Sequence, residues 1–159
     1  RWLNVTGVQT CALPICAAGA GPELVARVRR RSRGLSGGDI EALLGMHWRP
    51  RCMGAWYAIA ANDERLSSAV HESLETSLGH LSSPPLITAI LAYPRADSAE
   101  LLRDYAKHDF ENQWGAADFA LAALKRLEPR TPQVPGEGDA DANEILERLI
   151  SFGESLQGR

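Results

Sequence analysis

The residues with the clearest potential for chemistry lie in the segment His71-Glu72-Ser73-Leu74-Glu75. On a helix, His71 and Glu75 would lie on the same face, because they are four positions apart. The segment is close to the zinc-protease pattern His-Glu-x-x-His, but Glu75 stands where that pattern needs its second histidine. His108, on a later helix, could supply a further ligand. One hypothesis is therefore a metal-dependent enzyme that uses His71, Glu75 and His108; the alternative, which the pattern favours, is an ordinary polar helix face.

Other catalytic signatures are missing from the sequence. It contains no glycine-rich phosphate loop, nucleophile elbow or paired Cys/His nucleophile. Asp118 lies in the apolar stretch Trp114–Leu127 and could be a buried acid, but its small neighbours favour a partly exposed position. Beyond the first fifteen residues only Cys16 and Cys52 remain, which form no disulfide framework and indicate a reducing, cytoplasmic setting. We expect no catalytic residue, no metal and no cofactor.

Composition limits the kinds of partner. With 159 residues, of which 45% are hydrophobic, the chain can form one domain with a sizeable core. Its net charge of −3 argues against a general affinity for nucleic acid. No apolar run approaches the roughly 20 residues that cross a bilayer. We therefore expect a protein partner, and neither nucleic acid nor membrane.

One segment departs from this acidic balance. Five arginines occur between positions 27 and 33, at the end of a predicted helix that begins at Pro22. They could form a patch for nucleic acid or membrane. They could equally be a solvated helix face whose positive charges favour the C-terminal end of the helix dipole. The acidic remainder of the chain favours the second interpretation.

The segment 47–61 predicts the central helix of an all-helical domain. Pro50 suits a first helical turn, and no charged residue occurs between Arg51 and Asp63. A helix that is apolar on nearly all sides must be covered by other helices. Trp56 and Tyr57 supply much of the area to be buried.

A repeat of 31 residues connects this helix with two later ones. Similar apolar triplets begin at positions 58, 89 and 120, and the more polar helices between them keep the same offset. Val70 then matches Leu101, and Leu74 matches Tyr105. This pattern predicts that residues 16–131 form a short HEAT-like array of antiparallel helical hairpins, an α-solenoid with a right-handed superhelix. Each apolar helix would pair with the polar helix after it, and the third unit lacks such a helix.

Both ends of the chain differ from the repeats. Residues 5–15 resemble the conceptual translation of a sequencing-library adapter, so residues 1–15 are interpreted as an artefactual, disordered leader that replaces the true N-terminus. Prolines, glycines and acidic residues predict a flexible linker at 132–142. The apolar stripe beyond it predicts an amphipathic helix at 143–157 that caps the exposed end of the array.

Motifs around the central helix resemble those of a bacterial family catalogued as domain of unknown function 6000. They are Leu43-Leu44, Trp48-Arg49-Pro50-Arg51 and Ala55-Trp56, and the resemblance covers roughly residues 38–131. In that family the motifs lead into helical hairpins that end in an Ala-Leu-rich helix. The segment Leu86–Ala92 departs from the family pattern. The resemblance implies a helical fold and transfers no catalytic residue.

The function expected from this architecture is a non-catalytic protein–protein interaction module. By analogy between folds alone, a toxin–immunity partner is conceivable. On a helix at 64–78, a core stripe of Leu66, Val70, Leu74 and Leu78 would turn His71, Glu72 and Glu75 outward. The offset would place Arg103 and Lys107 beside them, either as part of a binding face or only as ion pairs. The large side chains expected in the core are Trp48, Trp56, Tyr57, Leu74, Tyr105 and Trp114.

Overall fold

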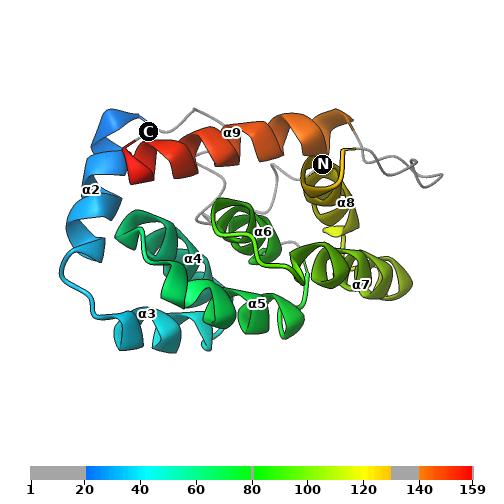
Figure 1. Ribbon diagram of the computed structural model, residues 1–159, viewed down its shortest axis with the longest axis horizontal. Helices are drawn as coiled ribbons and strands as arrows, with labels where there is room; N and C mark the ends of the chain where they lie inside the picture. The colour runs from blue at the N-terminus through cyan, green and yellow to red at the C-terminus, as the bar shows by residue number, and fades with distance from the viewer. Residues whose placement is uncertain (1–20, 80, 130–139, 159) are drawn as a thin grey trace, which may run out of the picture.

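The computed structural model describes residues 21–79, 81–129 and 140–158, and within them all regular secondary structure is helical (Figure 1). The predicted all-α class is confirmed. The predicted leader lies outside the described residues, and so does most of the predicted linker. No helix in the described segments is both long and apolar enough to cross a membrane. In chain order the helices are α2 (Pro22–Ser32), α3 (Gly37–Leu44), α4 (Trp48–Ala61), the 3-10 turn η2 (Glu64–Leu66), α5 (Ser67–Glu75), α6 (Ser83–Ala92), α7 (Ser98–Asn112), α8 (Ala117–Leu127) and α9 (Ala140–Gln157).

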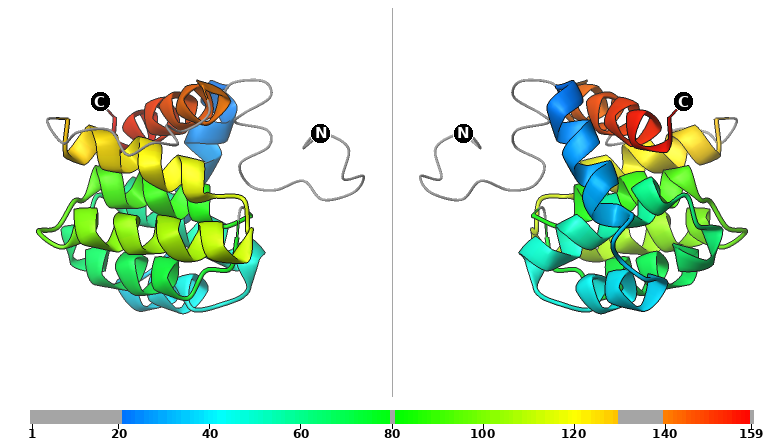
Figure 2. Two further views of the ribbon diagram at one scale, coloured as in Figure 1. Left: turned by 90° about the vertical axis from the view of Figure 1, so that its right-hand side faces the viewer. Right: turned by 90° about the vertical axis from the view of Figure 1, so that its left-hand side faces the viewer.

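The helices form three layers. The middle layer contains α4, α6 and α8, with α6 in contact with both neighbours. An outer layer contains α3, α5 and α7, each packed mainly on the middle helix that follows it in the chain. This pairing differs from the predicted one, in which each apolar helix pairs with the polar helix after it. In the observed pairing α8 also has a partner, which is α7. Figures 1 and 2 show α9 on the opposite side of the middle layer.

The position of α9 differs from the predicted end cap. This helix contacts α4, α6 and α8 and so lies across the whole middle layer instead of closing one end. Its apolar stripe includes Leu149 and Phe152, both buried, and the ring of Phe152 meets that of Trp56 edge-on at 5.0 Å between centroids. The reason is the apolar character of the middle helices, which need cover on the side that the outer layer leaves open.

The predicted helix at 64–78 is shorter in the structure. It begins with η2, and α5 ends at Glu75, so Leu78 lies beyond the helix and is 75% exposed instead of facing the core. His71 was expected to point outward but is buried, with 7% of its surface exposed. Of the expected core side chains, Trp56, Leu74 and Tyr105 are buried, whereas Trp48, Tyr57 and Trp114 are half-buried at the margin.

Replacement of Trp56 by alanine tests this core. The side chain is 1% exposed between α4 and α9, so Trp56→Ala should lower the free energy of unfolding by about 3–5 kcal/mol. The melting temperature would fall by roughly 10 °C or more. Trp48→Ala is the matched control, because Trp48 is half-buried beside Arg49 and should lose much less. Equal losses in thermal denaturation would contradict the packing described here.

Candidate functional site

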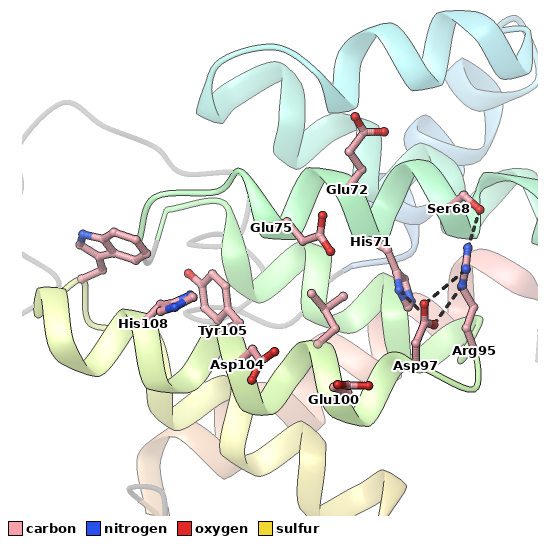
Figure 3. A pocket seen from close by; sticks show the side chains of 12 residues that line it. Ser68, His71, Glu72, Glu75, Arg95, Asp97, Glu100, Asp104, Tyr105 and His108 are labelled. Carbon is pink, nitrogen blue, oxygen red and sulfur yellow. Dashed lines mark hydrogen bonds and ion pairs between the residues drawn. The ribbon is translucent and has the colours of Figure 1, made fainter.

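The outer layer contains an open groove between α5 and α7, with a volume of about 840 Å³ (Figure 3). α5 contributes Ser68, His71, Glu72 and Glu75, which occupy one side of the helix at spacings of three and four residues. α7 contributes the facing wall, and Leu101 and Tyr105 supply its apolar part. Trp114, in the loop after α7, also belongs to the lining. The turn before α7, with Arg95 and Asp97, lies at one end of the groove (Figure 3).

The charge of this groove is strongly negative. Five carboxylates line it, from Glu72, Glu75, Asp97, Glu100 and Asp104. Among the described residues that line it, Arg95 is the only arginine, and it pairs with Asp97 at 3.1 Å between Nε and Oδ1. This part of the lining provides no lysine or arginine for the other four carboxylates, so it presents a negative field to solvent.

His71 holds the two helices together at the Asp97 end of the groove. Its Nε2 lies 3.1 Å from Ser98 Oγ, and its Nδ1 lies 3.5 Å from Asp97 Oδ1. Burial lowers the pKa of His71; Asp97 opposes this shift, and Arg95 adds to it. The neutral imidazole is thus favoured in the folded protein, with Ser98 as donor to Nε2.

Ser98, His71 and Asp97 follow the order of a nucleophilic triad, but the serine is in the wrong place for catalysis. Ser98 is 0% exposed, so no substrate reaches its hydroxyl. Its Oγ already accepts the backbone N–H of Arg95 at 2.8 Å. The cluster therefore fastens the start of α7 to α5, and it has no attacking group.

The three residues of the metal hypothesis lie in the same groove, but they do not form a metal site. His71, Glu75 and His108 all line the groove. Within the described segments, however, no group of three or more His, Cys, Asp or Glu side chains could hold a metal ion. Both ring nitrogens of His71 also face protein partners. The geometry does not favour a metal-dependent enzyme.

Arg103 and Lys107 lie elsewhere than predicted. Neither lines the groove, and Arg103 Nη2 pairs with Glu128 Oε2 at 2.9 Å, on the side of α7 that faces α8. The repeat aligned Leu101 with buried Val70, but in the structure Leu102 is fully buried and Leu101 lies in the groove wall. α7 is thus rotated about its axis relative to the prediction, and it presents acidic residues to α5 instead of basic ones.

The sequence reasoning missed a buried acid beneath the groove. Asp109 is 1% exposed, and its Oδ1 accepts the backbone N–H groups of Gly115, Ala116 and Ala117 at 3.0, 2.8 and 2.8 Å. It thereby caps the start of α8 from the end of α7. Asp118, the acid singled out in the sequence, is exposed. The available signal was the position of Asp109 in the apolar stripe of α7, just before a loop.

Tyr105 extends this buried network toward the groove. Its hydroxyl donates to Asp109 Oδ2 at 3.2 Å and lies within hydrogen-bond distance of Ser83 Oγ. Burial raises the pKa of Tyr105 far above its usual value, so the phenol stays protonated. The network joins α6, α7 and α8 directly under the groove wall.

Asp109→Ala should destabilise the protein by about 2–3 kcal/mol, because it leaves the N–H groups at the start of α8 without their acceptor. Asp109→Asn keeps one acceptor oxygen and should cost less. Asp118→Ala is the control, since this exposed acid in the first turn of α8 contributes only through the helix dipole. Chemical denaturation measures all three, and similar losses for Asp109→Ala and Asp118→Ala would contradict the capping role.

His71 should make the stability depend on pH. Because its pKa is lowered in the folded state, the unfolded chain takes up the proton at a higher pH, near the ordinary value of about 6.5. The contribution of His71 to the free energy of unfolding is complete above that pH, and it declines as the pH falls toward the lowered pKa of the folded state. His71→Asn should therefore lose less of its free energy of unfolding than the wild type between about pH 7.5 and pH 5. An identical decline in both proteins would refute this assignment.

Comparison with known proteins adds no family to this description. No protein-family model, curated protein or solved structure matches the chain. The resemblance to family 6000 stays a prediction from its motifs. The function must be inferred from the groove itself.

Proposed function

We propose that the protein is a non-catalytic interaction module whose groove between α5 and α7 binds a basic segment of a partner protein. The observation that carries this proposal is the charge of the lining, with five carboxylates and one arginine already paired. Each exposed ion pair contributes only about 0–1 kcal/mol, but several together steer a cationic partner and set its orientation.

The order of the helices supports a binding role. We infer that α3–α8 form a short HEAT-like array, because outer and middle helices alternate along the chain and each layer is continuous from one end to the other. In such arrays the helices of one layer provide an extended surface for a partner. The groove lies in that layer, between two of its three helices.

The lining also favours a polypeptide over a small anionic or apolar ligand. Carboxylates from α5 and α7 occupy both walls (Figure 3). The lining also includes Leu101, Tyr105 and Trp114, which provide apolar surface. Arginine and lysine side chains match this combination, because their aliphatic stems cover apolar surface while their charged ends reach carboxylates. The exposed hydroxyl in the described lining, that of Ser68, accepts a hydrogen bond from Arg95 and pairs with no general base, so the lining favours a binder over an enzyme.

A short arginine-rich peptide tests the proposal directly. Wild-type protein should bind it at low salt, and Glu72→Lys with Glu75→Lys should weaken binding at least about tenfold, which corresponds to roughly 1.4 kcal/mol. Calorimetric titration measures both affinities. Recovery of protein partners from the native host with the same two proteins should show the same loss.

The matched control carries the same change of charge outside the groove. Glu41 on α3 and Glu154 on α9 are both exposed, so Glu41→Lys with Glu154→Lys alters the net charge equally. This control should keep most of the affinity, and circular dichroism should show both variants folded. If both variants lose binding equally, only the overall charge matters and the groove is not the site. Wild-type protein that fails to bind the peptide would overturn the proposal.

A further inference from the structure

The arginines of α2 form a second charged surface that the groove proposal does not use. Arg27, Arg30 and Arg31 are exposed and share one side of α2, because they are three and four positions apart. Within the described residues, none of them forms an ion pair with an acidic side chain. This side of α2 also carries Glu23, so it presents three arginines against one carboxylate, a positive surface on a chain whose net charge is −3.

The opposite side of α2 anchors the helix to the fold. Val28 and Ser32 are buried, and Ser32 Oγ donates to the backbone oxygen of Tyr57 on α4 at 3.3 Å. α2 also contacts α9. The arginine surface is thus held in a fixed orientation, and it keeps its helical spacing when it meets a partner.

That spacing matches the carboxylates of the groove. Arg27 and Arg31 are four residues apart on α2, which is about 6 Å along a helix axis. Glu100 and Asp104 are also four residues apart on α7, and both line the groove. An α2 helix laid along the groove would therefore bring each arginine beside a carboxylate in register.

The two surfaces cannot meet within one molecule. Figure 1 shows α2 at one end of the molecule and α7 at the other, with α4 and α6 between them. An arginine side chain extends only a few ångströms beyond its helix and cannot bridge that distance. The arginines that enter a groove must therefore come from a different molecule.

We propose that α2 of one copy docks on the acidic groove of a second copy, so that the chain associates head to tail. This inference rests on the proposed function, since it uses the same groove, and it identifies the basic segment as α2. Because the two surfaces differ, the contact is heterologous and leaves a free groove at one end of each pair and a free α2 at the other. Assembly can then continue into short rows.

Sedimentation velocity at several protein concentrations tests the association. Wild-type protein should form concentration-dependent oligomers at about 50 mM salt and dissociate at about 500 mM, because salt screens exposed charges. The variants Arg30→Glu with Arg31→Glu, and Glu72→Lys with Glu75→Lys, should each be monomeric at low salt. The first change leaves Arg27 as the only arginine of that side of α2, beside the two introduced glutamates, and the second leaves the described groove lining with three carboxylates and three cationic side chains. Each change therefore removes the charge attraction between α2 and the groove.

Complementation makes the test specific to this pair of surfaces. An equimolar mixture of the two variants should form pairs again, because the unaltered α2 of the groove variant meets the unaltered groove of the α2 variant. Circular dichroism checks that every variant is folded, and a mixture of folded variants that stays monomeric would overturn the inference.

Further outcomes separate this inference from the proposed function. Wild-type protein that binds the arginine-rich peptide but stays monomeric at low salt would leave the groove proposal standing and overturn the self-association. Binding of heparin or duplex RNA that is lost with Arg30→Glu and Arg31→Glu, in a protein that never self-associates, would assign α2 to a polyanion instead.

Discussion

The structure depends on the burial of α6, a helix without a single charged residue. Every residue from Ser83 to Ile90 is buried, including the hydroxyl of Thr88, which donates to Pro84 O at 2.8 Å within the helix. A helix buried on all sides needs neighbours in every direction. α5 covers it from the outer layer, α9 covers it from the opposite side, and α4 and α8 flank it. Because α5 and α7 must both support the middle layer, they lie beside each other, and the groove is the space between their polar sides.

Buried polar contacts then hold this groove at both ends. His71 and Ser98 join α5 to the start of α7. At the other end, Tyr105 and Asp109 join α7 to α6 and to the first turn of α8. Buried hydrogen bonds are costly to leave unmade, so these contacts favour one separation of the two helices. The charges on the groove walls are therefore presented at a defined spacing, which a flexible acidic surface would lack.

The sequence predicted the layers better than the rotation of each helix. The charge-free segments of α4 and α6 identified the interior without any homologue. The repeat, however, relates positions along the chain and does not determine which side of α7 faces the core. Leu101 and Leu102 are both apolar, and only the packing of the folded chain buries Leu102. The burial of His71 depends on Ser98, far along the chain, and the role of Asp109 depends on backbone N–H groups that no side-chain pattern reveals.

The same limitation applies to charge. A net charge of −3 describes a nearly neutral chain and led to the expectation of no general affinity for nucleic acid. In the folded protein, positive charge gathers on α2 and negative charge lines the groove at the other end, and the two nearly cancel in the sum. Within about a Debye length of either surface, a partner experiences only the local charge, because salt screens the distant one. Recognition by such a protein therefore depends on where the fold places its positive and negative side chains. Two chains of equal composition can differ completely in the surfaces that they present to a partner.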